Sequence, residues 1–157
     1  MLFLNGYLIL ELTVMINLDE QLSENFTMRE MCYSETATAK MWLNVAGHRE
    51  ADNLRRLVRC TLQPLRDHLK TPLHVRSGYR TQQLNKHVGG ARNSLHLSGC
   101  AADVKMADWA MAFRAASYVI DCLPFTELIV SRKGLAIWLH IAYDPSSPKH
   151  TVSFKQY

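Results

Sequence analysis

The sequence predicts an α+β fold, with an antiparallel sheet and helices packed on one side of it. Two observations lead to this prediction. The clearest helix pattern comes first in the chain, and most strand patterns cluster late. A regular alternation of strands and helices would instead indicate a parallel, doubly wound sheet. The length of 157 residues and the hydrophobic share of 48% suit one domain with its own core.

The first 15 residues are apolar, but they make a poor secretory signal. They have no basic start, they contain Glu11, and no small-residue cleavage site follows. Three interpretations stay open: a start assigned too early, with Met15 as the natural first residue; a true leader; or a packed N-terminal strand. We therefore expect an extension over residues 1–21 and one domain over residues 22–157.

Two capping residues predict short helices after the extension. Thr27 precedes Glu30 by three residues, which is the spacing of a capping box. Ser34 is placed to cap a second short helix. Both helices should therefore begin directly after these hydroxyl residues.

The most regular helix pattern covers residues 48–69, where apolar residues recur at intervals of three and four. Pro64 lies inside this pattern and cannot donate a backbone hydrogen bond. We therefore expect a kink or a restart near Gln63.

The middle of the chain predicts shorter elements. Residues 73–76 suggest a strand, and residues 81–88 suggest a helix that is closed by two glycines. Residues 91–99 are small and polar, so we expect a loop. Residues 100–105 then suggest a buried strand.

A second long helix is predicted over residues 108–123, and Pro124 should stop it. Its apolar residues should face inward: Trp109, Ala112, Phe113, Ala116, Val119, Ile120 and Leu123. Three strands should follow, over residues 125–131, 135–143 and 152–156.

The charge and the cysteines limit the function classes. The net charge of +4 favours an anionic partner, but no basic cluster interleaved with aromatics indicates nucleic-acid binding. No apolar stretch is long enough to span a bilayer. The four cysteines form no C-x-x-C pair, and we expect them to be reduced and mostly buried.

Three residues form a candidate zinc site. His96 precedes Asp103 by seven positions, with a glycine and small residues between them, and His140 lies in the predicted strand 135–143. Catalytic zinc takes three such nitrogen and oxygen ligands and keeps one position open. His140 shares a strand face with Trp138 and Ala142, so it can meet the other two ligands across a sheet. Taken alone, each of these residues would be unremarkable in a core or on a surface.

The combination resembles the zinc D-alanyl-D-alanine carboxypeptidase family of peptidoglycan peptidases, and in particular its short, phage-associated branch. The motif S-x-H-x-x-G-x-A-x-D is matched at Ser94, His96, Gly99, Ala101 and Asp103. The motif W-x-H is matched at Trp138 and His140, and S-G-[YF]-R is matched at residues 77–80. The resemblance covers residues 22–143 and implies a Hedgehog/DD-peptidase-like fold.

The resemblance also implies roles for these residues. His96, Asp103 and His140 would bind Zn²⁺. Arg80 would act in catalysis by contacting the substrate carbonyl or its oxyanion, unless it is a structural ion-pair partner. Tyr79 and Ser94 would bind substrate, although the Ser94 hydroxyl could serve only a turn.

One expected catalytic group is missing. Metallopeptidases need a general base for the attacking water. In much of this family the base is an acid three residues before the last histidine, where this chain has Ile137. In the short branch the acid can come from the preceding strand, near Ser131.

Glu127 is the nearest remaining carboxylate on that strand, and it shares a face with Ser131. We therefore name Glu127 as the candidate catalytic acid/base. Asp121, His74 and His87 are weaker alternatives.

The sequence thus predicts a zinc metallopeptidase that cleaves peptidoglycan stem peptides, as a D-Ala-D-Ala carboxypeptidase or an endolysin-type endopeptidase. The alternative is a catalytically impaired, zinc-containing module that binds cell-wall peptides. We expect a monomer with no nucleic-acid partner and no membrane span. It would be made in the cytoplasm and act at the bacterial cell wall, with a phage or prophage origin.

Overall fold

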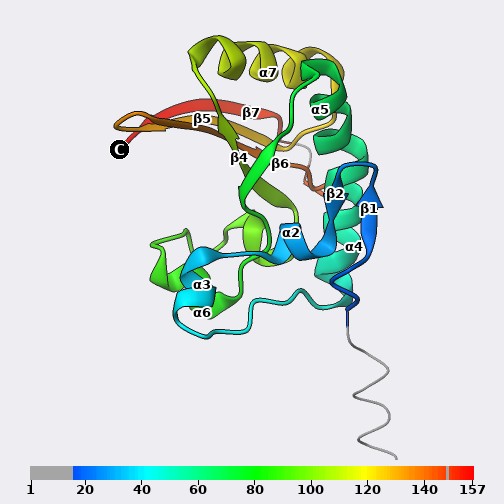
Figure 1. The fold of residues 1–157 in the computed structure, drawn as a ribbon. Coiled ribbons are helices and arrows are strands. Elements are labelled where there is room, and N and C mark those ends of the chain that lie inside the picture. Colours follow the sequence, from blue (N-terminus) through cyan, green and yellow to red (C-terminus); the bar gives the residue numbers. More distant parts are fainter. Residues whose placement is uncertain (1–15, 148) are drawn as a thin grey trace, which may run out of the picture.

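The computed structural model describes residues 16–147 and 149–157, and Figure 1 shows how their helices and strands are arranged. The interpretations given for residues 1–15 lie outside the described residues. A five-stranded sheet has the order β3-β4-β6-β5-β7. Its strands are β3 (His74–Ser77), β4 (Ala101–Met106), β5 (Glu127–Lys133), β6 (Ala136–Ala142) and β7 (Thr151–Gln156). The α+β class predicted from the sequence is confirmed.

The sheet is mixed rather than purely antiparallel. The pairs β3–β4, β4–β6 and β6–β5 are antiparallel, as expected, but β7 runs parallel to β5. The reason lies in the connection after β6. β6 ends beside Glu127, and β7 starts beside the same residue on the other side of β5. The chain therefore steps past the start of β5 and runs along it in the same direction.

The long helical segment changes its geometry in the middle, as Pro64 predicted. α4 (His48–Leu57) continues into one wide π turn, η1 (Val58–Leu62), and α5 (Gln63–Leu69) starts at Gln63. The predicted restart near Gln63 is confirmed. Pro64 occupies the first turn of α5, where its missing N–H costs little.

The predicted caps are also confirmed. The Thr27 hydroxyl accepts a hydrogen bond from the Glu30 amide at the start of α2 (Met28–Cys32). The Ser34 hydroxyl accepts one from the Ala37 amide at the start of α3 (Glu35–Ala39). Two short strands, β1 (Gln21–Ser23) and β2 (Phe26–Thr27), precede these helices.

Residues directly before β1 also contact the domain. Asp19 and Glu20 form ion pairs with Arg29 and Arg55. The side chains of Ile16 and Leu18 pack against the core. In the described part of the chain, no helix combines the length and apolarity that crossing a membrane would need.

The predicted inward face of the second long helix is partly wrong. α7 (Trp109–Cys122) presents Ala112, Ala115, Ala116 and Val119 to the core, whereas Phe113 and Ile120 are exposed. These residues are small, so the part of the helix surface that faces the core is narrow and the larger apolar side chains beside it stay outside. Trp109 stacks between Phe113 and Phe154 of β7, with ring centroids 5.7 and 5.6 Å away.

The expected loop over residues 91–99 contains a short 3₁₀ helix, η2 (Leu95–Ser98). The Ser94 hydroxyl caps its start, and Gly99 ends it in the left-handed region, at φ 71°. The remaining helix, α6 (Gln82–His87), begins after Thr81 as predicted.

All four cysteines are free, and Cys32 and Cys100 are buried. Cys60 is partly buried and Cys122 is exposed, so the expectation of mostly buried thiols holds for only half of them.

The two faces of the sheet have different roles. One face packs under the helices, and its core residues come from alternate positions of β4, β5 and β6: Val104, Leu128, Val130, Leu139 and Ile141. Asp103 and His140 alternate with these residues and therefore point to the other face. Figure 1 shows α4, α5 and α7 gathered along one side of the sheet, with α3 and α6 at its lower end.

Candidate metal centre

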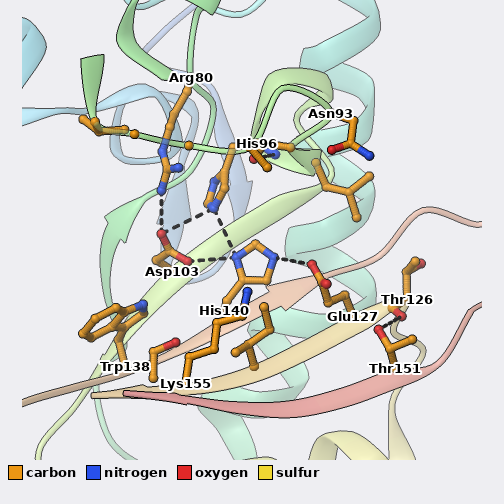
Figure 2. A pocket seen from close by; sticks show the side chains of 18 of the residues that line it. Arg80, Asn93, His96, Asp103, Thr126, Glu127, Trp138, His140, Thr151 and Lys155 are labelled. Carbon is orange, nitrogen blue, oxygen red and sulfur yellow. Dashed lines mark hydrogen bonds and ion pairs between the residues drawn. The ribbon is translucent and has the colours of Figure 1, made fainter. Parts of the chain in front are cut away.

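Three elements bring His96, Asp103 and His140 together. The antiparallel register of β4 and β6 places Asp103 directly opposite His140. η2 leads into β4 and carries His96 over the same end of the sheet, where the Arg80 amide donates to the His96 carbonyl. Figure 2 shows the three side chains converging on one point.

The separations between the three ligand atoms fit one zinc ion. His96 Nε2 lies 3.2 Å from His140 Nδ1 and 3.3 Å from Asp103 Oδ2, and His140 Nδ1 lies 2.9 Å from Asp103 Oδ1. Neighbouring ligands of a tetrahedral zinc ion are about 3.3 Å apart, because Zn–N bonds are about 2.0–2.1 Å long. All candidate ligand atoms lie within 4.8 Å of one another. The donor set is therefore preorganised for a small divalent cation.

The other ring nitrogen of each histidine also has a partner. His96 Nδ1 lies 2.7 Å from the Gly78 carbonyl, and His140 Nε2 lies 3.2 Å from Glu127 Oε2. Both partners are acceptors, so these two nitrogens carry the protons. A metal ion bound by His96 Nε2 and His140 Nδ1 would displace any proton on these two atoms, which in the metal-free protein lie beside the Asp103 carboxylate. Such outer partners are typical of metal-binding histidines.

Burial and neighbouring charges shift the pKa values of the candidate ligands in opposite directions. Burial lowers the pKa of His96, whose exposed fraction is 2%. Burial alone would raise the pKa of Asp103, but the charge of His96 and the hydrogen bonds from both histidines lower it instead. Burial would also lower the pKa of His140, but its hydrogen bonds to Asp103 and Glu127 raise it to about 9. The carboxylate is therefore ionised and ready to bind a cation.

Arg80 forms an ion pair with one of the candidate ligands. Its Nη2 lies 2.6 Å from Asp103 Oδ2, and its Nε donates to the Ser77 hydroxyl. Both partners of the ion pair are largely buried, with side chains 14% exposed. The guanidinium fixes the orientation of the Asp103 carboxylate, and it also lines the cavity in front of the candidate ligands.

The candidate ligands lie in a cavity of about 630 Å³. Ser94 and Trp138 line it, as do Ser131 and Glu127. Ile137 points to the opposite face of β6 and is buried in the core. Of the residues that the structure describes in this lining, only Asp103 and Glu127 are acidic.

Glu127 points at the centre from β5. The pKa of its carboxyl group is lowered mainly by the hydrogen bond to His140, and the charges of His140 and Lys155 add to this effect. Its side chain is 40% exposed. It holds the ring nitrogen of His140 that faces away from Asp103, so its oxygen lies across the imidazole from the candidate metal ligands.

The other residues singled out from the sequence lie elsewhere. The Tyr79 side chain packs against the core, and Tyr79 is not among the described residues that line the cavity. His74, His87 and Asp121 are not among the described residues that line this cavity either. The His87 ring instead contacts Trp42.

Sequence reasoning missed the contribution of β7. Thr151 and Lys155 line the cavity, and Tyr157 stacks on Trp138 with ring centroids 5.8 Å apart. The alternation of residues 151, 155 and 157 on one strand face was visible in the sequence. The parallel pairing with β5 that brings this face to the site was not.

The comparisons with known proteins agree with this geometry. The family model described as Peptidase M15 matches residues 24–141, which is more than half of the chain. No curated protein matches the chain. The matched residues include all three candidate ligands, and the peptidases of this family depend on zinc. The chain therefore belongs to the Peptidase M15 family, whose members are similar to zinc D-alanyl-D-alanine carboxypeptidases.

Proposed function

We propose that this protein is a zinc-dependent hydrolase that cleaves peptide bonds in peptidoglycan stem peptides, as a D-Ala-D-Ala carboxypeptidase or an endolysin-type endopeptidase. One observation carries the proposal. His96, Asp103 and His140 are spaced as zinc ligands in an open cavity, and the second nitrogen of each histidine is already held by an acceptor. We further propose a monomer that is made in the cytoplasm and acts at the bacterial cell wall, with a phage or prophage origin.

Zinc, when bound, supplies a Lewis acid and lowers the pKa of an attacking water. Arg80 is proposed to stabilise the negative charge that develops on the substrate carbonyl oxygen. Arg80 Nε donates to Ser77 and Nη2 donates to Asp103, whereas Nη1 makes no hydrogen bond among the described residues and could reach a substrate. Ser94 lines the cavity and is proposed to bind the substrate backbone. Tyr79, which packs against the core, is proposed only to support the position of Arg80.

Glu127 is the proposed acid/base. It is ionised and lines the cavity, and its Oε2 atom contacts His140 Nε2, while no donor among the described residues bonds to Oε1. To accept a proton from the attacking water, the carboxylate must turn away from His140 Nε2. Its 40% exposed side chain leaves space for this rotation.

A second function is favoured by the same contact. If Glu127 stays hydrogen-bonded to His140, its role is to orient this candidate metal ligand. No other free carboxylate among the described lining residues can then activate water. The protein would then be a zinc-containing module that binds cell-wall peptides with little or no turnover.

The two functions are separated by incubating the zinc-loaded protein with purified muropeptides and following the products by mass spectrometry. The hydrolase releases D-alanine or splits a cross-link, and E127Q abolishes this cleavage even when the variant is saturated with zinc. If the wild type binds muropeptides and leaves them intact, the hydrolase proposal is wrong and the binding module remains. If neither zinc nor muropeptide binds, both are wrong.

A further inference from the structure

Three lysines line the cavity on the side of β5 and β7. Lys133 lies at the end of β5, Lys149 precedes β7, and Lys155 lies on β7 itself. Lys149 and Lys155 are outside residues 24–141, which the family model matches. Two of the three lysines therefore lie in a part of the chain that the family model does not match.

The lining of the cavity is positively charged overall. With the two histidines neutral, as they are when they bind a metal, the three lysines and Arg80 against Asp103 and Glu127 leave two net positive charges among the described lining residues. Both carboxylates already have partners, Arg80 and His140 respectively. A zinc ion would add two more positive charges. The ligand that suits such a cavity is anionic.

Lys155 is the lysine whose charge acts on Glu127, because it contributes to the lowered pKa of that carboxyl group. The parallel register places Lys155 directly beside Ser131, whose side chain is buried at 2% exposure. Figure 2 shows the Lys155 side chain extending from β7 toward His140. Lys133 precedes the turn between β5 and β6, and Lys149 lies in the connection before β7, so both are at the rim.

We propose that Lys155 binds a carboxylate of the peptide ligand and thereby sets its position relative to His140. This inference rests on the proposed function, because it assumes a peptide in the cavity, but it holds for a hydrolase and for a binding module alike. The ligand class is a peptide with a free carboxylate next to the bond at the metal centre. That carboxylate comes either from the C-terminus or from an acidic side chain. A lysine–carboxylate contact combines charge attraction with a hydrogen bond.

The test measures binding rather than turnover. Isothermal titration compares three non-cleavable peptides that carry a ketomethylene group in place of the amide between two D-alanines. The first has a free C-terminus, the second has a C-terminal amide, and the third has that amide together with an acidic side chain. The zinc-loaded proteins are the wild type, K155M, K155R and K105M. Lys105 is an exposed lysine of the same sheet that does not line the cavity, so K105M is the matched control.

The wild type and K105M should bind a carboxylate peptide about tenfold more tightly than the C-terminal amide, since a hydrogen bond to a charged group is worth about that factor. K155M should lose this preference, K155R should keep part of it, and added salt should reduce it. Preference for the first or the third peptide identifies the source of the carboxylate. Zinc content and unfolding temperature should not change in K155M.

The inference is overturned if K155M retains the preference of the wild type, or if the wild type binds the carboxylate peptides and the amide equally. If the wild type binds none of the peptides, the proposed function fails, and this inference fails with it.

Discussion

The two walls of the cavity are built in different ways. The first wall, made of Arg80, His96 and Asp103, is largely buried, and it is held by an ion pair and by the Gly78 carbonyl behind His96. The second wall, made of Glu127, Ser131 and Lys155, lies on β5 and on the outermost strand of the sheet, β7. The His96 side chain is 2% exposed, whereas that of Glu127 is 40% exposed. His140 lies between the walls and contacts both Asp103 and Glu127.

This difference separates metal binding from ligand handling. The first wall fixes two ligand atoms through the β4–β6 register and through a backbone carbonyl that side-chain replacement does not remove. In the second wall, Ser131 is buried, but Glu127 and Lys155 present exposed side chains that a partner from solvent can reach. We therefore expect changes in the first wall to abolish zinc binding or to destabilise the fold. Changes in the second wall should alter zinc affinity, peptide affinity or turnover.

The largest effect should come from the ligands of the first wall. H96A or D103A should lower zinc affinity by more than the ten- to hundredfold that loss of an outer partner costs. D103A also leaves the largely buried Arg80 without its ion-pair partner, so its free energy of unfolding should fall. Competition with a chromophoric chelator measures the affinity. Zinc binding by H96A with wild-type affinity would contradict the role of this wall.

A methyl group at Gly78 should be the next most harmful change. A Cβ atom there would lie 2.2 Å from the Met31 carbonyl oxygen, and a backbone atom cannot easily move away. Overpacking of this kind costs about 3 kcal/mol, and it would also displace the acceptor of His96 Nδ1. Urea unfolding of G78A measures the loss.

The matched control for Gly78 is G134A. A Cβ at Gly134 meets no atom within 4 Å, and only its left-handed backbone, at φ 57°, opposes the change. We expect a loss of about 1 kcal/mol there. If G78A unfolds no more easily than G134A, the first wall is less rigid than its contacts indicate.

In the second wall, E127A should reduce zinc affinity by about ten- to hundredfold, because it removes the acceptor of His140 Nε2. E127Q should reduce it less, since an amide oxygen can still accept this hydrogen bond. The exposed Glu24 provides a control, E24A, which should bind zinc as the wild type does. If E127A and E24A bind zinc equally well, Glu127 does not orient His140.

The smallest effect should lie outside both walls. The Glu20–Arg55 ion pair lowers the pKa of Glu20, chiefly through the hydrogen bond from Arg55. A lowered carboxyl pKa stabilises the folded state above the unfolded pKa of about 4.3, and this contribution is lost as the pH falls through the folded pKa. E20Q should therefore lower the free energy of unfolding by up to about 1 kcal/mol at pH 7 and by less in acid. An equal loss of unfolding free energy at both pH values would contradict a stabilising role for this ion pair. Zinc binding by E20Q should not change.

The first wall could be predicted from the sequence far better than the second. His96, Asp103 and His140 stand in motifs that resemble those of a zinc peptidase family, and the caps at Thr27 and Ser34 follow from local chemistry. The role of the Gly78 carbonyl could not be found in this way, because any residue has a carbonyl group.

Other features depended on tertiary packing. The exposure of Phe113 and Ile120 reflects how closely α7 approaches the sheet, which helix periodicity does not encode. The place of Lys155 depends on the parallel pairing of β7 with β5, a long-range choice that strand propensity leaves open.

The most direct test of the zinc centre is a crystal structure of the zinc-loaded protein with anomalous data at the zinc edge. We expect one strong peak about 2.0–2.2 Å from His96 Nε2, from a carboxylate oxygen of Asp103 and from His140 Nδ1, with Glu127 still hydrogen-bonded to His140 Nε2. A zinc ion held by His140 Nε2, or no zinc peak among these three side chains, would contradict this expectation.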